Sequence, residues 1–314
     1  MLIADEKLGR EDILRLLQTD VYSEEYEHLL AASREYARRT FGRGYVFCQI
    51  GLDSAPCPGN CAFCSMAKDH FVVEKRFTRS AEEAVAEVKK AFTPAVSDLF
   101  LMTTECYDRA AFLQVVERVR GVLPEQTRLV VNTGDFDLTY AKKLRESGAT
   151  GAYHIVRLRE GKDTDIPPQR REKTLQAIAE SGLDLYYCVE PIGKEHTYEE
   201  IADEILRAQR LQVKYMAVMR RVGVRGTRKE NAGEISPREI AKIAAVSMLA
   251  VRPAISMNVH EVEPVAMAAG INQLYAEYGV NPRDCAAETS KNRGYSVQGC
   301  LELLAENGWE VPCV

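Results

Sequence analysis

Features that direct a chain to a membrane or to nucleic acid are scarce in this sequence of 314 residues. No apolar run approaches the roughly 18 residues of a membrane-spanning helix. The first residues lack the apolar core of a secretory signal, because charged residues begin at Asp5. No run is rich in lysine or arginine, and the net charge is −5. We therefore expect a cytoplasmic protein with no membrane or nucleic-acid partner.

Cysteine, by contrast, is plentiful, with nine residues. Without an export signal, we expect these thiols to bind metal or to pack in the core. Hydrophobic residues make up 46% of the chain, which is enough for a large core. The length allows one large α/β domain or two ordinary ones.

Three cysteines lie within the stretch 55–64, which reads APCPGNCAFC. Their spacing is Cys57-x3-Cys61-x2-Cys64, with Phe63 before the third cysteine. Each thiolate can ligate one iron of a [4Fe–4S] cluster, which ordinarily has four protein ligands. A cluster held by only three would keep one iron open for chemistry.

The composition of the loop supports convergence of its sulfurs, because Pro58 and Gly59 keep the segment from becoming a helix. The alternative is a zinc knuckle with Cys48 as the fourth thiolate ligand. Zinc knuckles usually pair two Cys-x2-Cys units, and the loop holds only one. The iron–sulfur interpretation is therefore preferred.

Apolar strands alternate with helical segments along the rest of the chain. Continuous apolar strands in this rhythm indicate a parallel sheet covered by helices. Eight such units close most simply as a (β/α)8 TIM-type barrel, and a six-unit open barrel with a separate tail is the alternative. The strands are expected at 45–50, 98–103, 128–132, 151–157, 183–189, 215–219, 254–259 and 271–277.

We expect three parts in the chain. Residues 1–42 form an N-terminal helical extension that closes one end of the body, residues 43–283 form the barrel, and residues 284–314 form a C-terminal tail over the barrel. Helices are expected to begin at capping boxes at Ser80, Thr197 and Ser236.

The cysteine loop resembles the signature of radical S-adenosylmethionine (SAM) enzymes. The resemblance implies that Cys57, Cys61 and Cys64 hold a [4Fe–4S] cluster whose fourth iron binds the amino and carboxylate groups of SAM. Reductive cleavage of SAM would give a 5′-deoxyadenosyl radical that abstracts hydrogen from a small-molecule or carrier-bound substrate. The resemblance also implies a barrel of this type and an electron donor of the ferredoxin or flavodoxin type.

Functional groups of such barrels gather at the C-terminal ends of the strands. The resemblance places Glu105 where family members bind the SAM amino group, although threonines stand where glycines are usual. Asn132 follows the next strand and could bind a ligand or belong to an ordinary turn. The plainer alternative for Glu105 is a solvated loop carboxylate.

Two arginines and a glutamate follow the next two strands. Arg157 and Arg159 should share one face of a strand, and either could bind the SAM carboxylate through two parallel hydrogen bonds. We prefer Arg159, which lies nearer the mouth, although salt bridges could occupy it. Glu190 is a carboxylate on a buried strand, so it must contact SAM or pair with an arginine.

Other candidates are less specific. The loop 220–227 could bind an anionic substrate or carrier, or be a solvated basic loop. His154 is expected in the core, and His260 could shuttle a proton or pack. Three tail cysteines could hold a second iron–sulfur cluster if the tail folds over the barrel mouth, or could simply pack; these are Cys285, Cys300 and Cys313.

The whole chain resembles the branch that contains biotin synthase, archaeal-type lipoyl synthase, HydE and methylornithine synthase, with loose similarity at 222–227 and 279–283. Biotin synthase holds a sulfur-donating cluster on inner strands, where this chain offers only Cys106 and Cys188. Sulfur insertion with a donor cluster held by the tail is the leading hypothesis. The alternative is radical rearrangement or metallocofactor assembly without sulfur donation. A zinc-stabilised hydrolase or scaffold and a redox carrier are hypotheses from other classes.

Overall fold

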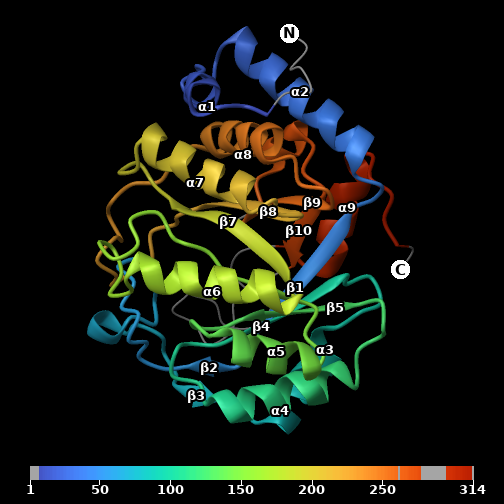
Figure 1. The fold of residues 1–314 in the computed structure, drawn as a ribbon. Coiled ribbons are helices and arrows are strands. Elements are labelled where there is room, and N and C mark those ends of the chain that lie inside the picture. The colour runs from blue at the N-terminus through green and yellow to red at the C-terminus, as the bar shows by residue number, and fades with distance from the viewer. Residues whose placement is uncertain (1–6, 261, 277–294, 313–314) are drawn as a thin grey trace.

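The computed structural model describes residues 7–260, 262–276 and 295–312. Eight parallel strands form a closed barrel in the order β1-β10-β9-β8-β7-β6-β5-β4 (Figure 1). The strands are β1 (Tyr45–Gly51), β4 (Asp98–Met102), β5 (Arg128–Asn132), β6 (Gly151–Tyr153), β7 (Asp184–Ile192), β8 (Tyr215–Arg220), β9 (Ser256–His260) and β10 (Gln273–Ala276). Because β1 pairs with both β4 and β10, the sheet has no open edge. The predicted (β/α)8 barrel is confirmed.

Helices cover the outside of this barrel. They are α3 (Ala81–Ala91), α4 (Arg109–Arg120), α5 (Leu138–Glu146), α6 (Pro168–Ser181), α7 (Tyr198–Arg210), α8 (Pro237–Val251) and the 3-10 helix η2 (Pro264–Ala269). Capping boxes begin α3 and α7, as the sequence predicts. At α8 the Ser236 side chain accepts from the backbone of Glu239, but the reciprocal bond of a capping box is missing. That prediction was half right.

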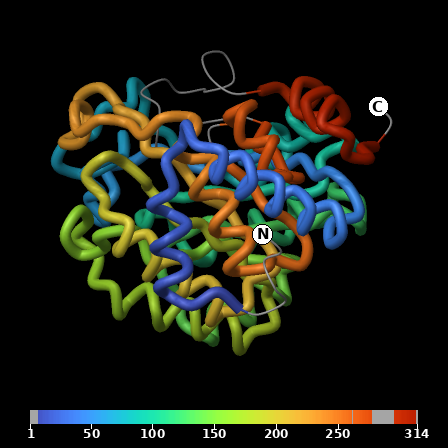
Figure 2. Tube along the Cα trace, turned by 90° about the horizontal axis from the view of Figure 1, so that it is seen from above, coloured from blue at the N-terminus to red at the C-terminus, as the bar shows by residue number. Residues whose placement is uncertain are grey.

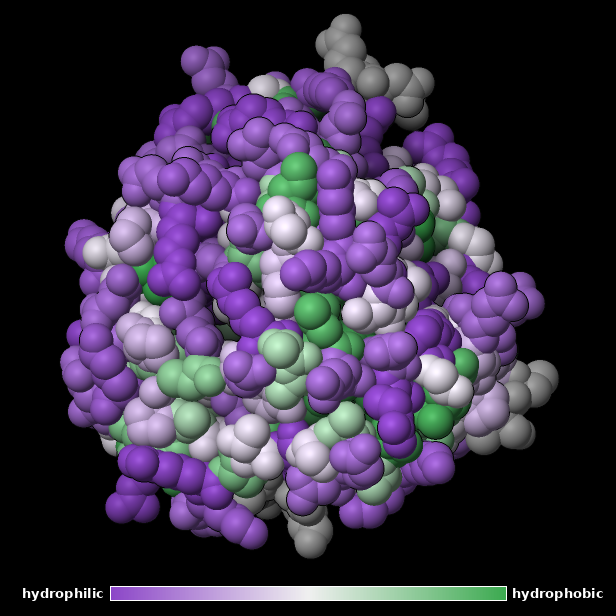
Figure 3. All heavy atoms as spheres, turned by 60° about the horizontal axis from the view of Figure 1, so that its bottom comes forward, coloured by the Kyte–Doolittle hydropathy of each residue, from purple (hydrophilic) through white to green (hydrophobic). Residues whose placement is uncertain are grey.

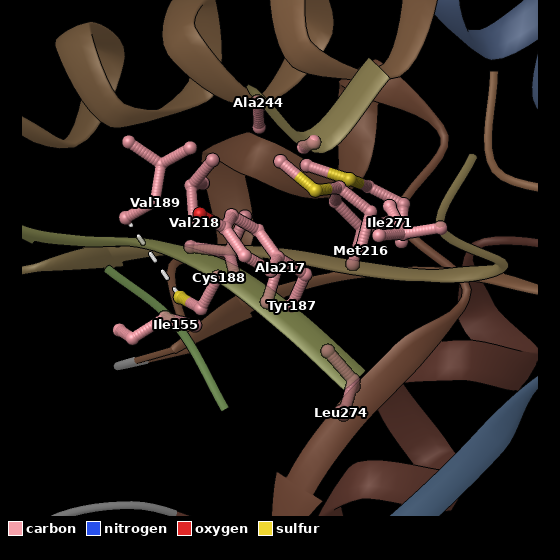
Figure 4. Close-up of a cluster of buried hydrophobic side chains, with 14 of the residues drawn as sticks. Ile155, Tyr187, Cys188, Val189, Met216, Ala217, Val218, Ala244, Ile271 and Leu274 are labelled. Carbon is pink, nitrogen blue, oxygen red and sulfur yellow. Dashed lines mark hydrogen bonds between the residues drawn. The ribbon is translucent and has the colours of Figure 1, made fainter. Parts of the chain in front are cut away.

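Side chains of the strands alternate between two cores. Inside the barrel an aromatic cluster includes Phe47, Phe100, Tyr186 and Tyr215. Outside, strand residues pack against the helices. Figure 4 shows Tyr187 of β7 and Met216 and Val218 of β8 in this outer core, with Ala244 of α8.

The N-terminal helices α1 (Arg10–Leu17) and α2 (Glu24–Thr40) form a second layer on the wall, over α7 and α8 (Figures 1 and 2). Contact on both sides explains why α8 is buried at every residue from Ile240 to Val251. The Ser33 hydroxyl ties α2 to the wall by donating to the Ala269 carbonyl, 2.7 Å away. The expectation that this extension closes an end of the barrel was wrong, because the buried face of α2 packs against helices.

The described part of the C-terminal tail also packs on the wall. Helix α9 (Val297–Glu306) lies against β1 and β10, in the place of the eighth barrel helix. The Trp309 indole donates to the Ile271 carbonyl at 2.7 Å and anchors the end of the tail. This part of the tail therefore lies beside the barrel, and the structure does not show it over the mouth.

A short antiparallel pair, β2 (Asp53–Ser54) and β3 (Phe77–Thr78), follows β1 and encloses the cysteine loop and the 3-10 helix η1 (Lys68–His70). The face of the molecule shown in Figure 3 is mostly hydrophilic, with hydrophobic residues in small groups. No described helix has the length and apolarity to cross a membrane.

Candidate functional site

A cavity opens at the C-terminal ends of the strands, beneath the cysteine loop. All three loop cysteines line it, together with residues of all eight barrel strands or of the loops that follow them. The polar and sulfur-bearing lining residues include Gln49, Cys57, Cys61, Cys64, Met66, Met102, Glu105, Asn132, Tyr153, Arg157, Arg171, Glu190, Met219, Arg221 and His260. Four of the five side chains predicted at strand ends are therefore gathered around one space.

Hydrogen bonds fix the shape of the cysteine loop. Within it, the Cys57 amide donates to the Met66 carbonyl at 2.7 Å. Asn60 has a positive φ of 50° and donates its side-chain amide to Asp69 and Asp165, at 2.7 and 3.1 Å. Ala62 donates its amide to a carbonyl of a neighbouring loop, that of Asp163, at 2.8 Å. These bonds bring the three thiols to one side of the cavity.

Burial sets the protonation of these thiols. It raises the pKa of Cys61 to about 11, although Arg157 opposes the shift, and it also raises the pKa of Cys57 and Cys64. The metal-free loop is therefore a set of neutral thiols, and a bound metal must displace their protons. Such soft sulfur donors suit iron–sulfur clusters or zinc.

The fourth thiolate of the zinc hypothesis lies elsewhere. Cys48 is 1% exposed and belongs to the outer core between the strands and the helices. Burial raises its pKa to about 12. Among the described residues, only three cysteines line the cavity, and they are the three of the loop.

Arg157 places a cation beside the cysteine loop. Its Nε lies 3.6 Å from Glu190 and its Nη1 lies 3.7 Å from Glu160, so both carboxylates attract it from beyond hydrogen-bond length. Both nitrogens are buried and lack a hydrogen-bond partner among the described residues. Burial lowers the pKa of Arg157, but Cys61 and the two carboxylates outweigh burial, and the net pKa is raised. An anionic ligand group would supply the missing acceptors.

Glu105 is an anionic residue that lines the same cavity. Its side chain is 11% exposed, and Oε1 is buried with no hydrogen bond in the described structure. The nearest cation is Arg170, 3.7 Å from Oε1. Asn132 lines the same cavity and donates to the Gln49 side chain at 3.1 Å.

The preferred arginine of the sequence analysis, Arg159, lies outside this cavity. Strand β6 ends at Tyr153, and Arg159 follows in a turn with a positive φ of 57°. Its guanidinium binds Glu200 at 2.7 and 3.1 Å. The two arginines do not share a face, because the strand is too short to carry its alternation that far.

Arg171 is a cavity residue that the sequence did not single out. It comes from the first turn of α6 and is 5% exposed. Asp135 and Glu160 each lie 3.3 Å from its guanidinium. The sequence gives no reason to select it, because candidate site residues were sought at the ends of predicted strands and Arg171 lies at the start of a helix.

A buried ion network supports Arg171 from below. His154 lies 3.1 Å from Asp135, and Arg170 lies at the same distance. Burial raises the pKa of Asp135, but His154 and the arginines outweigh it and lower this pKa to about 2. Burial also lowers the pKa of His154, so the histidine is neutral beside an ionised carboxylate. His154 is buried in the core, as expected, but its Nε2 has no hydrogen-bond partner of good geometry among the described residues.

The remaining candidates divide between the cavity and other places. Arg221 lines the cavity but is 2% exposed and bound to Glu195 at 3.0 Å. His260 lines the cavity and stacks on Tyr275. Cys300 is fully buried on the outer wall, with its thiol 3.5 Å from the Tyr275 carbonyl. Cys285 and Cys313 lie outside the described residues.

Comparison with known proteins finds relatives in sequence and in fold, although no protein-family model matches the chain. Biotin synthase of Carboxydothermus hydrogenoformans is 21% identical over 280 residues, which cover 83% of this chain and 85% of that protein. Biotin synthase of Rhizobium rhizogenes is 24% identical over 252 residues, 72% of this chain and 74% of that protein.

Solved structures share the fold. Methylornithine synthase (PylB) superposes with a TM-score of 0.84 at 18% identity, over 99% of this chain and 96% of that one. The hydrogenase maturase HydG from Carboxydothermus hydrogenoformans gives 0.79 at 18% identity, over 97% of this chain and 76% of that one. These similarities in sequence and fold support the radical SAM branch that contains biotin synthase and methylornithine synthase.

These similarities imply a [4Fe–4S] cluster and SAM, and the residues of the cavity fit both. The loop offers three thiols, one fewer than a closed cluster site requires. SAM carries an amino and a carboxylate group. The buried Oε1 of Glu105 and the buried nitrogens of Arg157 lack hydrogen bonds and have the opposite charges.

Proposed function

We propose that the chain holds a [4Fe–4S] cluster with Cys57, Cys61 and Cys64 and uses it to cleave SAM reductively. One observation carries the proposal. Three thiols, an unsatisfied arginine and an unsatisfied carboxylate converge in one cavity at the functional end of a barrel. When bound, the cluster and SAM together supply a radical that abstracts hydrogen from a substrate.

The side chains of this cavity bind and orient. Arg157 receives the carboxylate of SAM through its two free N–H groups, and Glu105 receives the amino group. Arg171, fixed by Asp135 and Glu160, adds positive charge on the same side. Asn132 and Gln49 face the cavity from the strands and offer amide groups to a substrate or to SAM.

The lower barrel excludes water from this space. Below the cavity, the aromatic cluster fills the interior, with Phe47, Phe100 and Tyr186 packed on one another. At the floor, the fully buried Asp98 accepts from Tyr186 at 2.6 Å and from Arg128 at 2.5 and 2.7 Å. A dry, closed floor suits a reactive radical, because water and stray hydrogen donors cannot enter from below.

The test is the release of 5′-deoxyadenosine. The anaerobically reconstituted chain, given SAM and a strong reductant, should form it, and Cys61→Ala should not. Cys300→Ala is the matched control, because this cysteine lies on the outer wall. Wild-type chain that holds iron but forms no 5′-deoxyadenosine would contradict the proposal.

For the finer reaction, we favour hydrogen abstraction for rearrangement or metallocofactor assembly, without sulfur donation. The described cavity supports this, since its cysteines are those of the loop. Sulfur insertion, the leading hypothesis from sequence, is the second candidate, because the relatives by sequence include biotin synthases. It requires a second cluster.

Iron and acid-labile sulfide per chain separate the two reactions. About four irons, all lost in the Cys57/Cys61/Cys64→Ala variant, would support one cluster and a reaction without sulfur donation. About eight, with about four kept in that variant, would support sulfur insertion. A small-molecule or carrier-bound substrate and a ferredoxin or flavodoxin donor are part of the same proposal.

A further inference from the structure

Asp53 lies at the stem of the cysteine loop, directly after β1. It belongs to β2 and pairs with Thr78 of β3. Its side chain is withdrawn from solvent, with the residue 2% exposed. A buried carboxylate is costly unless hydrogen bonds replace its water, so its partners are informative.

Both oxygens of this carboxylate bind one residue of another loop. Oδ1 accepts from the Thr104 amide at 2.7 Å, and Oδ2 accepts from the Thr104 hydroxyl. Because two donors of Thr104 bind the two oxygens of one carboxylate, they fix the orientation of Asp53 relative to Thr104 as well as the distance between them. Asp53 thus joins the stem of the cysteine loop to the turn that follows β4.

This turn presents Glu105 to the cavity. The Thr104 hydroxyl also accepts from the Cys106 amide at 3.2 Å, so it holds the residues on both sides of Glu105. The backbone of Glu105 also acts on the Cys57 thiol, whose pKa it lowers against the larger effect of burial. On its other side, Glu105 lies on Gly134, where an added Cβ would stand 2.9 Å from its Cγ.

We propose that Asp53 is a positioning residue that, through Thr104, aims Glu105 at the amino group of SAM and keeps the turn in register with Cys57. This inference rests on the proposed function for its ligand. Radical SAM proteins often have glycines before this glutamate. In this chain the position holds Thr103 and Thr104, and the second threonine supplies the donors that Asp53 binds.

The neighbouring Ser54 provides a matched control. Its hydroxyl is fully buried and lacks a hydrogen-bond partner among the described residues, so Ser54→Ala removes a polar atom of β2 without touching the turn. Thr104→Val keeps the shape of the side chain and removes only the hydroxyl. Thr104→Ser and Asp53→Asn keep hydrogen-bonding atoms at these positions. They should therefore keep the turn and the SAM affinity of the wild type.

Two measurements test the inference. The first is amide hydrogen exchange of residues 103–107 in the metal-free chain. The second is the dissociation constant of SAM for the reconstituted, unreduced protein. Thr104→Val and Asp53→Ala should exchange about tenfold faster at the turn and bind SAM about tenfold more weakly, which is the scale of a lost charged hydrogen bond. Ser54→Ala and the two conservative variants should match wild type.

The inference would be overturned if Thr104→Val and Asp53→Ala showed the same amide exchange at the turn and the same SAM affinity as Ser54→Ala. So would faster exchange with unchanged SAM affinity, because the turn would then not position Glu105. Wild type that binds no SAM would refute the proposed function instead, and exchange alone would then decide whether Asp53 holds the turn. Thr104→Val carries the test if Asp53→Ala fails to fold.

Discussion

At the scale of single residues, the structure separates two arginines that the sequence places together. Arg157 lines the cavity with unsatisfied nitrogens, and Arg159 is bound to Glu200 outside it. Strand alternation cannot hold beyond the end of β6 at Tyr153. Of the two arginines, Arg157 is therefore the one that lines the cavity.

This difference gives a paired prediction. Arg157→Leu should weaken SAM binding to the reconstituted protein by about tenfold or more, because a bidentate charged contact is lost. Arg159→Leu should change it by less than about twofold. Equilibrium dialysis with unreduced protein measures both. Equal losses in the two variants would argue against this assignment.

Asp135 should make stability depend on acid pH. Its folded-state pKa of about 2 lies below the ordinary value of 3.8. The ionised carboxylate therefore stabilises the fold at all pH values above about 4, and this contribution is lost as pH falls from about 4 towards about 2. Its size is about 2 kcal/mol.

Urea unfolding of wild type and Asp135→Asn between pH 7 and pH 3.5 checks this expectation. The difference in unfolding free energy should be constant above pH 5 and should shrink below pH 4. A difference that stays the same down to pH 3.5 would show that the carboxylate is not held ionised by its neighbours.

Local spacing determines which site residues the sequence can reveal. The three cysteines fall in one stretch, and Glu105, Asn132 and Glu190 follow apolar strands, so all were visible. Arg171 and Asp53 were not, because their partners come from other elements. Such contacts depend on how the loops fold over one another, and no periodicity records them.

At the scale of elements, long apolar strands and capped helices were predictable, because these signals are local. The two-residue strands β2 and β3 were missed, since they are too short for any alternation. Helix α9 was also missed, because its segment was assigned to a tail. The apolar residues of α2 recur near helical spacing, so the sequence predicts that one face of this helix is buried. The sequence does not predict that the face packs on α8.

The turn before β10 gives a prediction at this scale. Gly270 has a φ of +88°, and a Cβ there would lie 2.8 Å from the Arg34 Cα in α2. Gly270→Ala should therefore lower stability by about 3 kcal/mol through backbone strain and displacement of α2. Gly42→Ala is the control, because a Cβ added at that residue would have no neighbour within 4 Å. Equal unfolding midpoints in urea would contradict this packing.

At the scale of the whole molecule, closure of the barrel brings distant strand ends into one site. Residues from Gln49 to Tyr275 line a single cavity because β1 pairs with both β4 and β10. Eight units in sequence were enough to predict closure. They did not predict which side chains would be left with unsatisfied atoms, because that depends on final distances of a few ångströms.

The most direct test of the account is electron paramagnetic resonance of the reduced, anaerobically reconstituted protein. Wild type should give the signal of a reduced [4Fe–4S] cluster, and addition of SAM should change that signal, because SAM would bind the open iron. The Cys57/Cys61/Cys64→Ala variant should give no such signal. Zinc in place of iron, or a cluster signal that SAM leaves unchanged, would contradict a radical SAM site in this cavity.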